Sequence, residues 1–130
     1  MFARSDKVEE LEAVSSQLWQ TNVLGNVHLF HLFLPLVLKG NVKKVITIST
    51  GVADLDFTNE VGIDIGSLYA ASKAAMNIIV AKFSVQYKSD GVLFMAISPG
   101  VVEVGHYSDS TYPCLSSRLR YRGHLANAFP

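Results

Sequence analysis

The chain has 130 residues, of which 49% are hydrophobic and 17% are charged. This balance excludes the intrinsically disordered class and suits one small globular domain. Eleven basic side chains offset eleven acidic ones, so no net charge favours nucleic acid or an anionic membrane, and we expect a small molecule or another protein as partner. The single cysteine, Cys114, permits no internal disulfide, and we expect a reducing, cytoplasmic location.

A long helix is predicted from about Val8 to Lys39, because its apolar residues keep helical spacing and Gly40 supplies a stop. Pro35 is a candidate position for a bend. The most apolar stretch, residues 23–38, is shorter than the ~20 residues that a membrane-spanning helix needs, and it contains polar side chains. We therefore interpret this element as a buried helix and expect no membrane anchor.

A β-branched run, Val45–Ile48, predicts a first strand that leads into Ser49 and Thr50. The polar, glycine-containing stretch 52–66 predicts a loop. Ser67 is expected to cap a second helix that extends to about Lys88.

The continuous apolar run Val92–Ile97 predicts a second strand, buried on both faces of a parallel sheet. Strand, helix and strand form a crossover unit, so the fold class is α/β. Residues 106–130 are more polar and aperiodic, and we expect them to form a poorly ordered tail. The three arginines in that tail accompany no nucleic-acid motif, so we expect no nucleic-acid partner.

Tyr69 and Lys73 are four residues apart, which places both side chains on one face of the second helix, one turn from each other. A neighbouring positive charge favours the ionised form of a phenol, which can then exchange a proton with an alcohol or a carbonyl. Such a pair also arises by chance, so the pair alone is a weak signal. Its place between a strand that ends in hydroxyl residues and a strand that ends in Pro-Gly makes it a candidate acid/base device.

Four segments together resemble the short-chain dehydrogenase/reductase family: Thr21-Asn22-Val23-Leu24-Gly25, Ile48-Ser49-Thr50, Tyr69-Ala70-Ala71-Ser72-Lys73 and Ser98-Pro99-Gly100-Val101-Val102. The match covers about Leu18 to Gly105. The resemblance implies a partial Rossmann-like parallel sheet flanked by helices in residues 1–105. It also implies an NAD- or NADP-dependent oxidoreductase that interconverts a small-molecule carbonyl and alcohol by hydride transfer.

The resemblance also assigns roles to single residues. It makes Tyr69 the general acid/base, Lys73 the residue that holds the nicotinamide ribose, and Asn22 part of a water-linked proton relay. The hydroxyl that binds the substrate oxygen falls on Thr50, with Ser49 as the fallback; for both, ordinary turn hydrogen bonding is the alternative. Pro99, Gly100 and Val102 match the segment beside the nicotinamide, where an ordinary turn is again the alternative for Pro99 and Gly100.

Two further features concern a metal site and the completeness of the cofactor site. His28 and His31 have helical spacing but no third ligand, so we expect packing and no metal site. The sequence contains no glycine-rich strand-to-helix turn that would bind a cofactor pyrophosphate, and NAD cannot be distinguished from NADP. The alternative function is therefore a catalytically inactive truncated fragment or interaction module. Its first strand would have an uncovered edge, and we expect a homo-oligomer formed through the two long helices.

Overall fold

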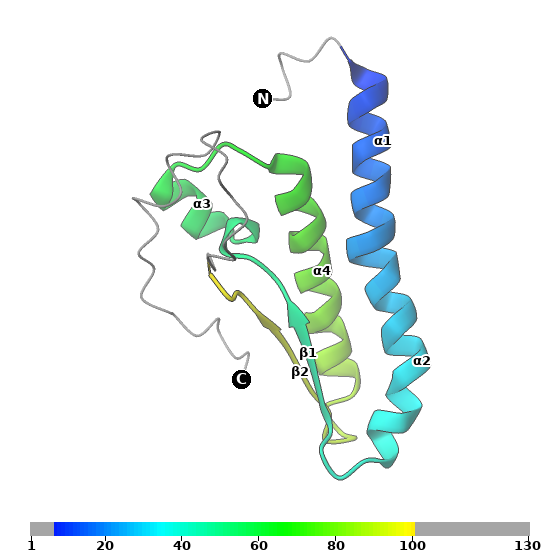
Figure 1. Ribbon diagram of the computed structural model, residues 1–130. Helices are drawn as coiled ribbons and strands as arrows, with labels where there is room; N and C mark the ends of the chain where they lie inside the picture. The colour runs from blue at the N-terminus through cyan, green and yellow to red at the C-terminus, as the bar shows by residue number, and fades with distance from the viewer. Residues whose placement is uncertain (1–6, 101–130) are drawn as a thin grey trace, which may run out of the picture.

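The structure is a computed structural model that describes residues 7–100. In chain order its elements are α1 (Val8–Trp19), a π-helical turn (Gln20–Leu24), α2 (Gly25–Lys39), β1 (Lys44–Ile48), a 3-10 turn (Gly51–Ala53), α3 (Leu55–Val61), α4 (Ser67–Gln86) and β2 (Leu93–Ile97) (Figure 1). The predicted tail 106–130 and the cofactor candidate Val102 lie outside the described residues.

The predicted long helix is confirmed: α1, the π turn and α2 form 32 consecutive helical residues, Val8–Lys39. The helix continues through Pro35 and ends where the Gly40 amide donates to the carbonyl oxygens of Leu36 and Val37, both at 3.1 Å. The sequence pattern did not predict the π turn at Gln20–Leu24, because one inserted residue shifts the apolar spacing by a single position, which lies within the ordinary variation of helical patterns.

The prediction that this helix is buried is wrong for much of its surface. Only Val23, Phe30 and Leu34 are buried along the helix, and four large apolar side chains of α2 are exposed, namely Leu29, Leu32, Phe33 and Leu36. The helix also has the length and the mean hydropathy, 1.4, of a membrane span, and 17% of its most apolar window is buried. Length and composition alone give the same result for core helices of soluble proteins, so they decide nothing about a membrane.

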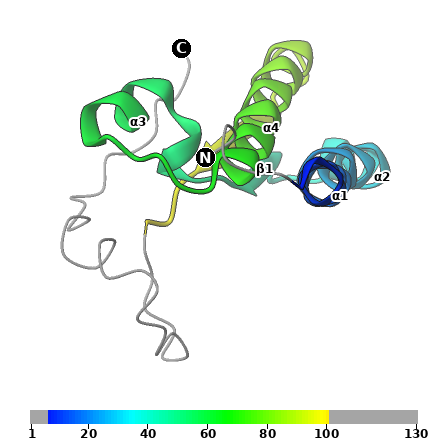
Figure 2. The ribbon, with the colours of Figure 1, turned by 90° about the horizontal axis from the view of Figure 1, so that it is seen from above.

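The two strands pair in parallel, with Lys44 opposite Leu93 and Ile48 opposite Ile97. Helix α4 connects them and lies on one side of the strands, with α1 and α2 beside it (Figure 2). This confirms the α/β class and the partial Rossmann-like arrangement. Side chains alternate between the two faces of a strand, so Phe94 is buried at 5% exposure toward the helices whereas its neighbour Leu93 is 42% exposed.

The expectation that the second strand is buried on both faces is therefore wrong within the described residues. Ile46 and Ile48 of β1 are 56% and 53% exposed, on the same face as Leu93. A continuous apolar run indicates that both faces can be buried, but the burial itself requires a second layer of chain.

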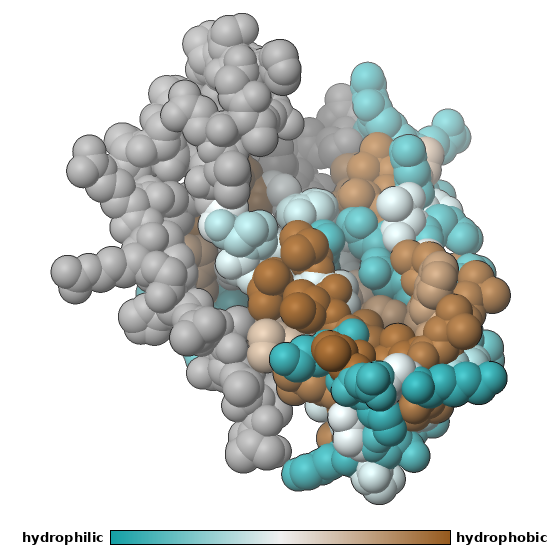
Figure 3. All heavy atoms as spheres, turned by 60° about the horizontal axis from the view of Figure 1, so that its bottom comes forward, coloured by the Kyte–Doolittle hydropathy of each residue, from teal (hydrophilic) through white to brown (hydrophobic). Residues whose placement is uncertain are grey.

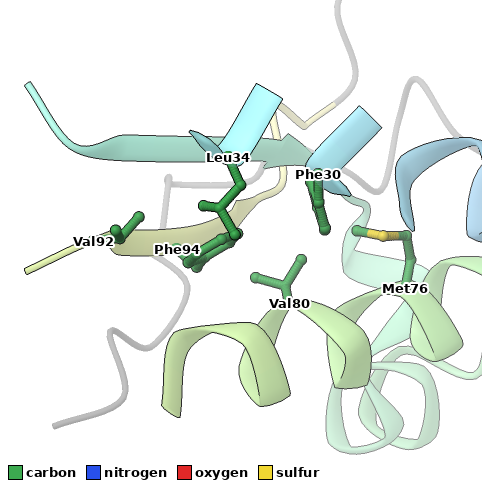
Figure 4. Packing of buried hydrophobic residues seen from close by; sticks show 6 residues of the cluster. All are labelled: Phe30, Leu34, Met76, Val80, Val92 and Phe94. Carbon is green, nitrogen blue, oxygen red and sulfur yellow. The ribbon is translucent and has the colours of Figure 1, made fainter. Parts of the chain in front are cut away.

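The core lies between α2, α4 and β2, where six buried side chains point toward one another (Figure 4). Its aromatic part is arranged edge to face: the Phe30 ring centroid is 5.2 Å from that of Phe83 and 5.6 Å from that of Phe94. The cluster comprises Phe30, Leu34, Met76, Val80, Val92 and Phe94. It fixes α4 against the sheet and so sets the position of the turn that carries Tyr69.

The segment predicted as a loop contains helical structure. Asp54 accepts a hydrogen bond from the Phe57 amide at 2.8 Å and thereby caps α3, which ends at Gly62 with φ of 68°. The seven residues of α3 are too few to show an apolar period, and Leu55 is exposed. The helix therefore depends on the local Asp54 cap, which an apolar pattern does not reveal. Ser67 is the first residue of α4 and Gly66 takes the capping position without a side-chain bond, so the predicted Ser67 cap is also wrong.

Candidate active site

Tyr69 and Lys73 lie in the first turns of α4, beside the carboxyl end of β1. The Lys73 ammonium is 5.8 Å from the centroid of the Tyr69 ring, within the range of a cation–π contact. It also donates a hydrogen bond to the Ile48 carbonyl oxygen at 2.9 Å, the last carbonyl of β1. The structure thus brings the two predicted residues together at the edge where open α/β sheets bind their ligands.

Tyr69 is 40% exposed. Within residues 7–100 its hydroxyl has no hydrogen-bond partner and is free to bind one. The Lys73 ammonium uses one of its three donors on Ile48. The arrangement can therefore present a phenol and a fixed positive charge to a small polar molecule.

The two hydroxyl candidates at the end of β1 differ in their surroundings. Ser49 is 7% exposed, and its hydroxyl donates to the Asn77 side-chain oxygen at 2.6 Å. Its amide continues the sheet by donating to the Ile97 carbonyl oxygen at 2.7 Å. Thr50 is partly buried and extended, with φ of −152°, and its side chain makes no capping bond. Successive side chains of an extended backbone point in opposite directions, so the side chains of Thr50 and Ser49 leave the chain on opposite sides and do not share the contact with Asn77.

Asn22 lies in the π turn, and its side-chain amide donates to the Ser72 hydroxyl oxygen at 3.0 Å. Ser72, which lies between Tyr69 and Lys73 in the sequence, is buried. Its hydroxyl donates to the Tyr69 carbonyl oxygen at 2.7 Å. The Asn26 side chain in turn donates to the Asn22 carbonyl oxygen at 2.8 Å. Asn22 is thus joined to the helical turn that carries the tyrosine and the lysine.

Sequence reasoning did not single out Asn77, Ser72 or Asn26. Asn77 follows Lys73 by one helical turn and Asn26 follows Asn22 by one turn, so helical spacing from the predicted residues was the available signal. Polar side chains at such spacing are also common on solvated helix faces, which is why the signal is weak.

Pro99 and Gly100 follow β2 and are exposed. Gly100 has φ of 75°, and a Cβ built there would meet nothing within 4 Å among the described residues. Because β2 pairs in parallel with β1, this turn emerges at the same edge of the sheet as Ser49 and Thr50. Glycine is favoured at Gly100 by this backbone conformation.

An apolar hollow of about 250 Å³ lies between the segment 52–65 and one flank of α4. Its α4 side is formed by three alanines and a serine, whose small side chains leave the space open. Its residues include Val52, Leu55, Ile63, Ile65, Ser67, Ala70, Ala71 and Ala74. The hollow adds an apolar surface next to the turn that carries Tyr69, and no sequence motif predicted it.

His28 and His31 are exposed on α2, so the expectation that they are packing residues is wrong. Residues 7–100 contain no group of three potential metal ligands.

The family model for short chain dehydrogenases matches residues 3–112 of the chain. The chain belongs to this family. It is 63% identical over 95% of its length to the short-chain dehydrogenase/reductase iacC of Pestalotiopsis fici, covering 45% of that protein. It is 56% identical over 79% of its length to the short chain dehydrogenase virK of Hypocrea virens, covering 38%, and 47% identical over 71% to the short-chain dehydrogenase/reductase AacuF of Aspergillus aculeatus, covering 35%.

The enzymes of this family are oxidoreductases. Short-chain dehydrogenases generally use NAD or NADP and act on small-molecule substrates. The chain spans less than half the length of the curated relatives it matches, so the activity of a whole enzyme is a matter for proposal.

Proposed function

We propose that the chain carries the acid/base part of an NAD- or NADP-dependent oxidoreductase that interconverts a carbonyl and an alcohol by hydride transfer. The observation that carries the proposal is the accessible Tyr69 phenol with the Lys73 ammonium 5.8 Å from its ring, at the carboxyl edge of the sheet. The Lys73 ammonium beside the ring can stabilise negative charge that develops on the phenol oxygen while a proton is transferred in either direction.

The described residues fit the nicotinamide end of such a cofactor. The Lys73 ammonium has donors beyond the one that Ile48 uses, and these can hold the ribose hydroxyls. Pro99 and the side-chain-free Gly100 would border the nicotinamide, because they emerge at the same sheet edge. The bound cofactor supplies or accepts the hydride. NAD and NADP differ at a phosphate that none of these residues reads, so both are proposed.

The chain's own residues handle the proton. In reduction, the Tyr69 hydroxyl donates its proton to the carbonyl oxygen of the substrate; in oxidation, the Tyr69 phenolate accepts the proton of the alcohol. The hydroxyl that holds the substrate oxygen is assigned to Thr50, with Ser49 as the fallback, because the Ser49 hydroxyl is already bound to Asn77. Asn22 supports the Lys73 side of the site as part of a proton relay.

A second candidate function is that of a catalytically silent fragment or interaction module, and the unpaired edge of β1 favours it. In the described part, β1 pairs with β2 alone, and the side of β1 next to α2 borders a groove of about 210 Å³ lined in part by Leu29, Phe33 and Ile46. An unpaired strand edge with apolar surroundings favours pairing with another chain segment.

Thermal melting in the presence of NADH or NADPH separates the two candidates. A ligand that binds only the folded chain must raise the midpoint, so a rise at millimolar nucleotide supports the oxidoreductase. No rise with either nucleotide would refute it for this chain. With binding shown, Tyr69→Phe should abolish turnover and keep the rise in midpoint, whereas the control Tyr87→Phe, at the other end of α4, should keep both.

We further propose that the chain self-associates through α2 and α4. Hydrophobic residues gather on the side of the molecule where α2 and the strands lie (Figure 3). Leu32 and Phe33 are 70% and 55% exposed, and Ile78 and Val85 of α4 are 63% and 75% exposed. Exposed large apolar side chains of this kind are typical of protein interfaces. Sedimentation of a stable folded monomer at all concentrations would contradict the proposal.

A further inference from the structure

The π turn at Gln20–Leu24 is the irregular part of an otherwise regular helix of 32 residues. Within such a turn the backbone bonds run from residue i to i+5, a rare geometry that occurs mostly as single turns and frequently at functional sites. Val23, inside the turn, is 1% exposed, so the turn is packed against the rest of the molecule. Contacts specific to this turn must offset its poorer backbone geometry.

Three hydrogen bonds supply such contacts, and one of them, from Asn22 to Ser72, connects the turn to α4. Asn26 donates to the Asn22 carbonyl oxygen at 2.8 Å, Asn22 donates to the Ser72 hydroxyl at 3.0 Å, and Ser72 donates to the Tyr69 carbonyl oxygen at 2.7 Å. The second and third bonds share the Ser72 hydroxyl, which accepts from Asn22 and donates to Tyr69, so these two form a series, whereas Asn26 binds the backbone carbonyl of Asn22 and braces the turn itself. Bonds in series strengthen one another, particularly when they are shielded from water, and Ser72 is 4% exposed.

The Tyr69 carbonyl oxygen, which accepts from Ser72, is important for the site. In an α-helix the carbonyl of residue 69 accepts the backbone amide of residue 73, so this oxygen lies in the helical link between Tyr69 and Lys73. Ser72 adds a second donor to that oxygen. Any movement of the π turn is thereby transmitted to the segment that sets the tyrosine and the lysine relative to each other.

We infer that Asn26, Asn22 and Ser72 form a clamp between the π turn and α4, in which Ser72 and Asn26 are positioning residues that hold the Tyr69–Lys73 turn in place. The catalytic meaning of the clamp rests on the proposed function of Tyr69 and Lys73. Its structural content does not, because it concerns the fixed arrangement of two helical turns. The clamp also accounts for the buried serine within the Tyr69–Lys73 interval, which touches no substrate-accessible surface.

A pair of variants of nearly equal shape isolates the Ser72 hydroxyl. Ser72→Thr keeps the hydroxyl and adds a methyl group, whereas Ser72→Val adds the same bulk without the hydroxyl. In the full chain we expect Ser72→Val to accelerate amide hydrogen exchange roughly tenfold in residues 20–26 and 67–73 relative to Ser72→Thr, since both hydrogen bonds of the Ser72 hydroxyl are lost. Exchange in the core residues 76–83 should change by less than half of that factor.

Two further variants keep the test decisive if Ser72→Val does not fold. Asn26→Ala adds no bulk and should accelerate exchange in residues 20–26 by roughly threefold, since it removes the bond to the Asn22 backbone carbonyl that braces the turn. Ser84→Ala is the matched control, because Ser84 lies in the same helix without a hydrogen bond of its side chain in the described part. It should leave both segments unchanged.

A spectroscopic readout distinguishes positioning from general stabilisation. In a chain labelled at the tyrosine ring carbons, Tyr69→Phe identifies the Tyr69 resonance, and Ser72→Val should shift this resonance whereas Ser72→Thr should restore it. A uniform rise in exchange over all segments, or an unmoved Tyr69 resonance in Ser72→Val, would overturn the inference. Neither readout needs a nucleotide, so failure of the clamp and failure of the proposed function are distinguishable.

Discussion

Replacing Phe94 by alanine removes a ring from the middle of the aromatic cluster. The side chain is 5% exposed, and its ring centroid lies 5.6 Å from those of Phe30 and Phe83 and 6.1 Å from that of Tyr87. Such truncations cost ~3–5 kcal/mol through lost transfer free energy and the cavity that remains. A small domain has a free energy of unfolding near the lower end of ~5–15 kcal/mol. We expect Phe94→Ala to remove most of the stability of the chain.

Urea denaturation followed by circular dichroism measures this loss. A decrease of about 4 kcal/mol with a slope of about 2 kcal/mol per molar lowers the midpoint by ~2 M. Leu93→Ala is the matched control, because Leu93 is the adjacent strand residue on the opposite face, where it is 42% exposed. It should cost about 1 kcal/mol or less. Equal losses for the two variants would refute the conclusion that one face of the sheet is uncovered. Both variants should be measured at two protein concentrations, because self-association raises the apparent stability.

Three further predictions concern single side chains. Thr47→Val should leave stability unchanged or raise it by up to about 1 kcal/mol in the same urea assay, because the Thr47 hydroxyl is buried without a partner among the described residues; a clear loss would indicate a bound water or partner there. Ser49→Ala should cost ~1–3 kcal/mol by leaving the Asn77 acceptor unpaired, whereas Thr50→Ala should leave the urea midpoint almost unchanged and lower any measurable turnover; the reverse pattern would make Ser49 the substrate-binding hydroxyl. Leu32→Glu should shift sedimentation toward the monomer without lowering the thermal midpoint of the folded monomer, because Leu32 is 70% exposed; an unchanged oligomer would place the interface elsewhere.

The sequence predicted the elements whose apolar pattern is long or continuous. The helix at Val8–Lys39 and the strands at 44–48 and 93–97 agree with the structure to within a residue or two. The second helix ends at Gln86, two residues before the predicted Lys88. Periodicity succeeds here because burial of one face of each element is what stabilises it. It failed for α3, whose seven residues depend on the Asp54 cap and bury no side chain.

The candidate site was predictable only where its residues share one helix. The spacing of Tyr69 and Lys73 places them together without knowledge of the fold, since one turn of helix separates them. The contacts of Lys73 with Ile48, of Ser49 with Asn77 and of Asn22 with Ser72 join residues that are 25 to 50 positions apart. No local pattern specifies such pairs, because they depend on how α4 packs on the strands.

The sequence by itself determined the family, the α/β class and the Tyr69–Lys73 pair, because each follows from local spacing or from motifs that persist along the chain. The tertiary structure decided which hydroxyl at the end of β1 faces inward, where the π turn lies and which face of the sheet is covered. These depend on the packing of α2 and α4 against one face of two strands. Packing is a property of side chains brought together from distant segments, and the Tyr69–Lys73 turn is held where it is by those contacts.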